Sequence, residues 1–221
     1  MNVRAVCVDV DGTLYSIRRM VRDHLSTVWP LRRFFRDLHR VRDAMRGVHY
    51  DDFRREQARR LARETGTDEA EAARRVEEVV EQRWMNVFWT TRPFRGAEET
   101  LRRLVLGGLR LAVLSDYPIG IKLHGMGLGD LPFAARVNAE RTGALKPHRA
   151  PFEAVSEQLG VEPDRILHIG DREEYDVAGA LAAGFRAALF YSGRRRPRSR
   201  ADFAFSDWRR LIPLMRWRGM V

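Results

Sequence analysis

From Pro93 onward the sequence alternates short apolar runs with longer amphipathic stretches, and this alternation constrains the fold more than any other feature. Four of the apolar runs have the length of buried strands, at 109–114, 134–138, 165–169 and 186–190. Helical patterns that each end at a glycine lie at roughly 96–106, 149–159 and 178–183. Because parallel strands need crossover helices, we predict an α/β fold built on a doubly wound, Rossmann-like parallel sheet.

Two further segments extend this sheet. The apolar run at 3–8 has the composition of a buried strand and stops at the Asp11-Gly12 turn. Residues 201–205 are predicted to form an edge strand, after which Ser206 is expected to cap a short helix through Leu214.

The segment between the first strand and Pro93 differs, because its patterns are helical and show no strand. An amphipathic stripe from Val76 to Phe88 belongs to a helix that begins after Thr67 or Asp68. We therefore predict an α/β core domain and an inserted α-helical cap domain, formed by 1–14 with 93–221 and by 15–92 respectively. Six aromatic residues are expected to form the core of the cap rather than a substrate site: Trp29, Phe34, Phe35, Trp84, Phe88 and Trp89.

The net charge of +10 is unevenly distributed and comes almost wholly from arginine, with 38 Arg and only 2 Lys. Residues 18–64 and 194–221 each carry a net charge of +7, so the rest of the chain is acidic. Such blocks could attract a nucleic acid or an acidic partner. For 18–64 we favour a solvated helix face, because charged residues are mostly exposed and arginine is abundant throughout this chain. For the arginine cluster at 194–200 we favour a surface loop, because it lacks interleaved aromatic residues.

The compartment is predicted from cysteine usage and hydropathy. The single cysteine, Cys7, excludes an intramolecular disulfide, and no run of about 18 apolar residues could span a membrane. The first apolar run contains Asp9 and Asp11, which a signal peptide would not. We expect a cytoplasmic protein without a membrane partner.

Polar side chains follow three of the predicted strands. Asp9 and Asp11 end the first strand, Ser115 ends the strand at 109–114, and Asp171 follows the strand at 165–169. The carboxyl ends of parallel strands share one edge of the sheet, where ligands bind. Lys146 lies in the loop before the helix at 149–159 and is one of only two lysines. Each signal alone is common in turns, but together they predict one site.

These residue types suit phosphoryl transfer. Carboxylates that share a cavity repel each other unless a cation joins them, and carboxylate oxygens suit Mg²⁺. Asp9 can form an aspartyl-phosphate, while Asp11 can protonate the leaving oxygen and later activate water. Ser115 and Lys146 can neutralise and orient the transferring group.

The motifs in this order closely resemble those of the haloacid dehalogenase-like (HAD) hydrolase superfamily. The matching segments are Asp9-Val10-Asp11-Gly12-Thr13-Leu14, the apolar run closing on Ser115, Lys146-Pro147, and Ile169-Gly170-Asp171 followed by Asp176-Val177-Ala178-Gly179-Ala180. The resemblance covers roughly 3–14 and 93–215, and the helical insertion is similar to the family's type C1 cap.

The resemblance implies a role for each motif residue. Asp9 would be the nucleophile and a metal ligand, and Asp11 the acid and base whose backbone carbonyl also touches Mg²⁺. Asp171 would be a further metal ligand, and Asp176 would support the metal shell. The family often has Asn where this chain has Asp116, and an extra acid beside a phosphate is unfavourable unless it points away or meets a cation.

The sequence therefore predicts a Mg²⁺-dependent phosphohydrolase that acts on a small phosphorylated metabolite through an aspartyl-phosphate. Two alternatives stay open. One is a phosphomutase or phosphotransferase of the same superfamily, and the other is a non-catalytic HAD-fold binding protein. The substrate depends on the cap, where no motif identifies it.

Overall fold

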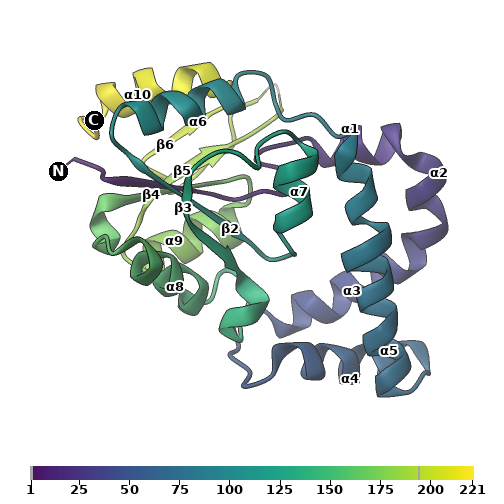
Figure 1. Cartoon of the computed structure of the whole chain (residues 1–221). Coiled ribbons are helices and arrows are strands. Elements are labelled where there is room, and N and C mark those ends of the chain that lie inside the picture. The colour runs from purple at the N-terminus through teal and green to yellow at the C-terminus, as the bar shows by residue number, and fades with distance from the viewer. Residues whose placement is uncertain (1, 194) are drawn as a thin grey trace.

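The computed structural model describes residues 2–193 and 195–221, and its centre is a six-stranded parallel sheet (Figure 1). The strand order is β3-β2-β1-β4-β5-β6. The strands are β1 (Ala5–Val8), β2 (Arg110–Ser115), β3 (Phe133–Asn138), β4 (Ile166–Gly170), β5 (Arg186–Phe190) and β6 (Phe203–Phe205). The predicted doubly wound parallel sheet is thus confirmed, with β6 at an edge.

Helices cover both faces of the sheet because successive residues of each buried strand point to opposite sides. Along β1, Val6 and Val8 pack in the cluster beneath α6 (Ala97–Leu106) and α10 (Leu211–Trp217). Ala5 and Cys7 pack in the opposite cluster, beneath α8 (Arg149–Leu159) and α9 (Ala178–Ala182). Burial on both faces explains why the strands read as continuous apolar runs.

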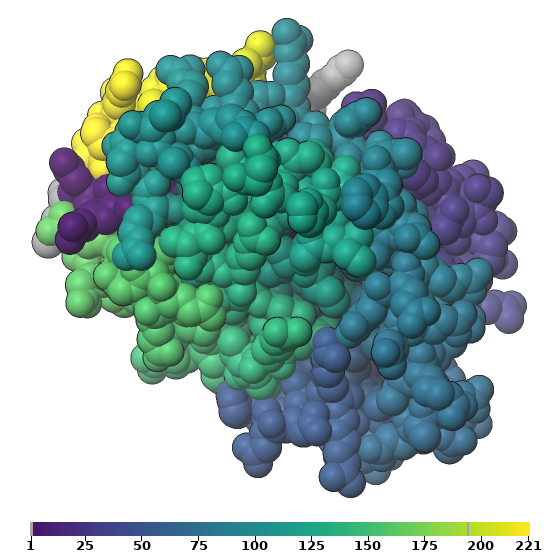
Figure 2. Space-filling model, in the orientation of Figure 1, coloured from purple at the N-terminus to yellow at the C-terminus, as the bar shows by residue number. Residues whose placement is uncertain are grey.

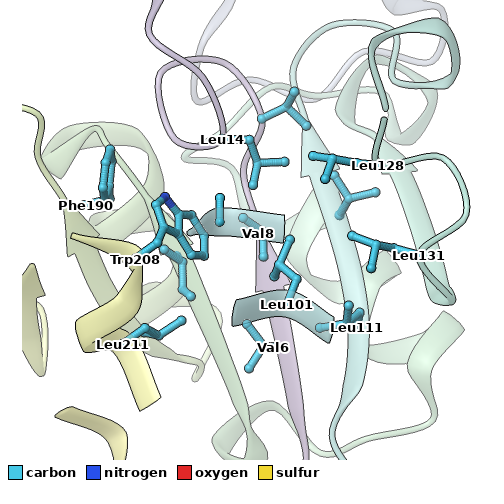
Figure 3. Close-up of a cluster of buried hydrophobic side chains, with 14 of the residues drawn as sticks. Val6, Val8, Leu14, Leu101, Leu111, Leu128, Leu131, Phe190, Trp208 and Leu211 are labelled. Atoms are coloured by element: carbon cyan, nitrogen blue, oxygen red, sulfur yellow. The ribbon is translucent and has the colours of Figure 1, made fainter. Parts of the chain in front are cut away.

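Trp208 links the C-terminal part of the chain to the loop that follows β1 (Figure 3). Its side chain is fully buried and lies against Phe190 and Phe205, with ring centroids 5.9 and 5.6 Å away. Its indole Nε1 donates a hydrogen bond to the Thr13 carbonyl oxygen at 3.3 Å. The same aromatic core therefore supports the loop that carries the predicted nucleophile.

Between β1 and α6 the described residues form helices and no long strand. The elements are α1 (Ile17–Asp23), α2 (Leu25–Val28), η1 (Trp29–Leu31), α3 (Arg32–Met45), α4 (Phe53–Thr65), α5 (Glu69–Val76), η2 (Glu77–Arg83) and η3 (Met85–Trp89). Asp68 caps α5 as expected, by accepting a hydrogen bond from the Glu71 backbone N–H. Figures 1 and 2 show this insertion, in purple and blue, on one side of the molecule.

The structure corrects the predicted cap and end of the last helix and adds one helix that the sequence did not predict. Ser206 does not cap the last helix, because the Asp207 side chain accepts the hydrogen bond from the Arg209 backbone N–H. The helical stretch continues past Leu214 to Trp217. Helix α7 (Gly120–Gly125) is absent from the sequence prediction, since six residues with glycine at both ends carry too short a periodic pattern.

Ion pairs occupy most of the arginines in 18–64. Ten of the fourteen contact a carboxylate, namely Arg19, Arg22, Arg36, Arg40, Arg42, Arg46, Arg54, Arg55, Arg59 and Arg60. This pairing favours the interpretation of a solvated, self-neutralised surface, while binding of nucleic acid stays untested. In the second block, Arg194 lies outside the described residues.

Within the described ranges, none of the helices combines the length and the apolarity needed to cross a lipid bilayer.

Removing the Trp208 indole should destabilise the fold strongly. We expect Trp208→Ala to lower the free energy of unfolding by about 3–5 kcal/mol, because the substitution leaves a cavity and an unpaired Thr13 carbonyl. Urea denaturation followed by far-UV circular dichroism measures the change. Trp217→Ala is the matched control, since that side chain is 74% exposed and should change stability little. Equal losses in the two variants would contradict this account of the core.

Candidate active site

The site lies at the carboxyl end of β1, which pairs with β2 on one side and β4 on the other. The strand order reverses at β1, because β2 and β3 lie on one side of it and β4, β5 and β6 on the other. Open α/β sheets bind ligands at such a reversal. Asp9 directly follows β1, and its backbone N–H donates to the Ile169 carbonyl at 2.8 Å. Gly12 has φ +96°, and a Cβ there would collide with the Asp171 carboxylate. The Asp-Gly turn is therefore required for Asp171 to approach the loop.

Lys146 joins two of the predicted carboxylates. Its Nζ lies 2.7 Å from Asp9 Oδ1 and 2.5 Å from Asp176 Oδ1, and all three side chains are buried. Thr13 Oγ1 donates to the other Asp9 oxygen at 2.9 Å. His168, expected in the core, is indeed buried in β4, and its Nε2 lies 3.2 Å from Asp176 Oδ1. The nucleophile candidate is thus held at both oxygens.

The carboxylates around Lys146 have strongly shifted pKa values. Burial raises the pKa of Asp9 well above its usual range, and the neighbouring acids add to the rise although Lys146 opposes it. Burial, with the Asp176 charge, raises the pKa of Asp171 to about 7. For Asp176, burial raises the pKa, but Lys146 and the hydrogen bond with His168 outweigh it and lower the pKa overall. The carboxylates around Lys146 therefore outnumber the positively charged groups that contact them.

A divalent cation fits this cluster. Asp9, Asp171 and Asp176 each present an oxygen, and these oxygens lie within 4.8 Å of one another. Asp171 Oδ1 is buried and accepts no hydrogen bond from the described residues. With Asp11 and its partner Lys122, the site has four carboxylates and two ammonium groups, which leaves two formal negative charges. A single Mg²⁺ would balance them, and oxygen ligands are those it prefers.

Asp11 is held by a second lysine that the sequence argument missed. The Nζ of Lys122, on α7, lies 2.6 Å from both Asp11 carboxylate oxygens and is fully buried. The hydroxyls of Tyr15 and Ser115 donate to the same carboxylate at 2.6 and 3.1 Å. Burial raises the pKa of Asp11, but Lys122 and these hydrogen bonds outweigh it and lower the pKa overall. The rarity of lysine in this chain was the signal that could have identified Lys122.

Asp116, the departure from the family pattern, meets a cation from the helical insertion. Arg46 Nη1, at the end of α3, lies 2.7 Å from Asp116 Oδ2 and 2.5 Å from the Lys146 carbonyl oxygen. The Lys146 backbone N–H donates to Asp116 Oδ1 at 3.1 Å. Arg42, which is buried in α3, donates to the Asp116 carbonyl at 2.5 Å and to Glu140. Asp116 therefore connects the insertion to the loop of Lys146.

A hollow of about 300 Å³ opens above these groups. Side chains from the sheet edge and from the insertion line it together, including Asp9, Asp11, Ile17, His39, Asp43, Arg46, Tyr117, Lys146, Asp171, Arg172 and Tyr175. A larger hollow of about 590 Å³ opens at the amino ends of the strands, but among the described residues no carboxylate side chain lines it. The chemistry therefore lies at the smaller hollow. The structure brings all six predicted residues to it or directly behind it: Asp9, Asp11, Ser115, Lys146, Asp171 and Asp176.

Solved structures share this architecture over nearly the whole chain. A HAD phosphatase from Thermococcus onnurineus superposes with a TM-score of 0.65 at 21% identity, covering 97% of this chain and 98% of that one. A 2-haloacid dehalogenase from Pseudomonas syringae superposes with a TM-score of 0.66 at 24% identity, covering 97% and 99%. At these identities the likeness concerns the fold alone, which phosphatases and dehalogenases have in common.

The sequence relatives include proteins named phosphoglycolate phosphatase. The phosphoglycolate phosphatase of Rhodospirillum rubrum is 37% identical over 106 residues, which is 47% of this chain and 43% of the relative. The chain thus spans about half the length of the curated relatives it matches. The sequence model of the haloacid dehalogenase-like hydrolases matches residues 3–184, which include every candidate residue described above. The chain belongs to the haloacid dehalogenase-like hydrolase family.

Proposed function

We propose that the protein is a Mg²⁺-dependent phosphatase that hydrolyses a small phosphate monoester through an aspartyl-phosphate on Asp9. The observation that carries the proposal is the pairing of two acids with two buried lysines at one strand end. Lys146 holds Asp9, and Lys122 holds Asp11. The similarity to proteins named phosphoglycolate phosphatase also supports a small phosphorylated substrate.

In the first step a carboxylate oxygen of Asp9 attacks the phosphorus and the ester P–O bond breaks. The departing oxygen takes a proton from the Asp11 carboxyl group, so this step uses the protonated form of Asp11, which Lys122 and the hydrogen bonds to Asp11 disfavour. Lys146 places its positive charge beside the attacking carboxylate, where it can also stabilise the oxygens of the transferring group. The product of this step is the free alcohol and a phosphorylated Asp9.

In the second step Asp11, now a carboxylate, takes a proton from water while the water oxygen attacks the phosphorus. The bond between the phosphorus and Asp9 breaks, inorganic phosphate leaves, and Asp11 is again protonated. Lys122, Tyr15 and Ser115 favour the carboxylate form of Asp11 that this step needs.

Asp9, Asp171 and the Asp11 backbone carbonyl would hold Mg²⁺, and Asp176 would support these ligands. When bound, the ion would neutralise the substrate phosphate and polarise its oxygens. Thr13 and Lys146 orient the Asp9 carboxylate for the attack. Arg172 contributes its backbone N–H to Asp176 at 3.0 Å, which keeps that carboxylate turned toward Lys146.

Asp11 favours ester hydrolysis over dehalogenation. A halide ion leaves without needing a proton, whereas an alkoxide needs one, so an acid held two residues after the nucleophile serves an ester. A phosphomutase would share the first step and return the phosphoryl group to a sugar. A non-catalytic binding protein would not need two buried lysines at these carboxylates, each of which is costly to desolvate.

The division into a core domain, 1–14 with 93–221, and a cap domain, 15–92, belongs to this proposal. Arg42 and Arg46 of the insertion reach the Asp116 segment at the edge of the site, which supports a cap that closes over the substrate. A cytoplasmic location fits a phosphatase of small metabolites and is proposed with it.

Replacing the nucleophile should abolish turnover without unfolding the protein. We expect Asp9→Asn to reduce release of inorganic phosphate from acetyl phosphate or p-nitrophenyl phosphate by at least ~10³-fold, because the amide is a poor nucleophile. Removing Mg²⁺ with EDTA should stop the reaction, and added MgCl₂ should restore it. Acid quenching after one turnover should leave the phosphoryl group on the peptide that contains Asp9.

Asp23→Asn serves as the control, since Asp23 is a surface aspartate on α1. Turnover by Asp9→Asn equal to that of the unmodified protein would overturn the proposal. Formation of an isomerised sugar phosphate in place of inorganic phosphate would identify a mutase instead.

Lys122 should contribute stability only while Asp11 is charged. We expect Lys122→Met to lower the free energy of unfolding by about 3 kcal/mol, at the lower end for a broken buried pair because the Asp11 side chain is 21% exposed. Adding Asp11→Asn should restore about 1–2 kcal/mol, because it removes the charge left unpaired. Urea denaturation of the two single variants and the double variant measures the coupling. Strictly additive effects would show that the pair does not act as one unit.

A further inference from the structure

A second, apolar hollow adjoins the site on the side of Asp11. Its volume is about 190 Å³, and apolar side chains from the insertion form most of its wall: Tyr15, Ile17, Val21, Val28, Phe35 and Trp84. It shares Asp11, Ile17, His39 and Tyr117 with the hollow above the carboxylates, so the two hollows are adjacent. The apolar hollow therefore borders Asp11.

The wall is aromatic and largely without free charge. The Phe35 and Trp84 rings lie 4.6 Å apart at 55°, and Trp84 packs in turn on Phe88 at 6.1 Å. The guanidinium of Arg32 stacks 4.3 Å from the Trp29 ring and donates to the Trp29 carbonyl, which turns this cation toward the Trp29 ring. Asp11 is neutralised by Lys122. Among the described lining residues, the Arg32 guanidinium, which stacks on the Trp29 ring, is the one permanent cation that a carboxylate such as that of glycolate could meet.

This hollow lies on the side of the site where the leaving group of the substrate is expected. In an in-line displacement the leaving oxygen departs opposite to Asp9 and takes its proton from Asp11, so the organic part of the substrate extends from the Asp11 side. The expectation that Phe35 and Trp84 belong only to the cap core is accordingly incomplete, because both also line this hollow. The same expectation is wrong for Trp29 and Trp89, because these side chains are 58% and 60% exposed and do not lie in a core.

We propose, building on the phosphatase function proposed above, that the hollow lined by Phe35, Trp84 and Ile17 binds the leaving group, and that the substrate is the phosphate monoester of an alcohol bearing an aromatic ring. A cavity of about 150 Å³ with apolar walls accommodates benzene, so a hollow of this size admits one ring. The Ile17 side chain, 42% exposed, gains an apolar neighbour when the ring binds.

Benzyl phosphate and ethyl phosphate test the assignment, because their leaving alcohols have nearly the same acidity and differ chiefly in the ring. We expect kcat/KM to be about 10- to 100-fold higher for benzyl phosphate, the gain from burying a phenyl group. Trp84→Ala should reduce the benzyl-to-ethyl ratio about tenfold, since it removes one wall. Val28→Trp should reduce it similarly by filling the hollow, because Val28 is half-buried at the end of α2 and lines the hollow. Trp89→Ala, outside the hollow, should leave the ratio and the activity unchanged.

Simple phosphates separate this inference from the proposed function. If acetyl phosphate, p-nitrophenyl phosphate, benzyl phosphate and ethyl phosphate are all left unhydrolysed, the phosphatase proposal itself fails. If any of them is hydrolysed but benzyl phosphate is no better than ethyl phosphate, or the ratio is insensitive to both Trp84→Ala and Val28→Trp, the leaving-group assignment is overturned. Faster hydrolysis of 2-phosphoglycolate than of benzyl phosphate would likewise overturn it, in favour of a small acidic substrate.

Discussion

The contact between the Lys146 ammonium and the carboxylates of Asp9 and Asp176 is the interaction on which the site depends. It joins the loop after β1, the loop before α8 and the helical turn η6 (Glu173–Val177) that follows β4. A buried ammonium is stable only while it is paired, so each of these segments is held in place by the others. The sheet positions the three segments, and the ion pairs determine how their side chains meet.

The same principle joins the helical insertion to the sheet. Asp116 would repel a phosphate if it faced one alone, but Arg46 from α3 neutralises it and the Lys146 backbone N–H hydrogen-bonds it. Glu140 and Arg42 form a second buried pair across this boundary. Charged pairs of this kind contribute specificity of orientation more than net stability. They place His39 of α3, and Arg46 directly after α3, in the wall of the hollow.

The sheet could be predicted because strands buried on both faces are nearly uninterrupted apolar runs, and Asp9, Asp11 and Asp171 could be predicted because parallel topology gathers strand ends. Lys122 was missed, since α7 is too short to show a period and its lysine contacts a residue 111 positions away, which left the rarity of lysine as the one signal for it. The partner of Asp116 could not be predicted either. Arg46 is one of many arginines in its segment, and only the packing of the folded chain places this one beside Asp116. The aromatic wall of Phe35 and Trp84 was missed for a related reason, since a periodic stripe does not distinguish a side chain that fills a core from one that borders a hollow.

The use of lysine in this chain has a practical chemical consequence. The sequence contains only two, and both ammonium groups are buried in the site, paired with the proposed nucleophile and the proposed acid. Arginine supplies the surface charge, and its guanidinium does not react with acylating reagents as an amine does. Lysine-directed acylation would therefore proceed only when the site opens, so its rate would report on the separation of the insertion from the sheet.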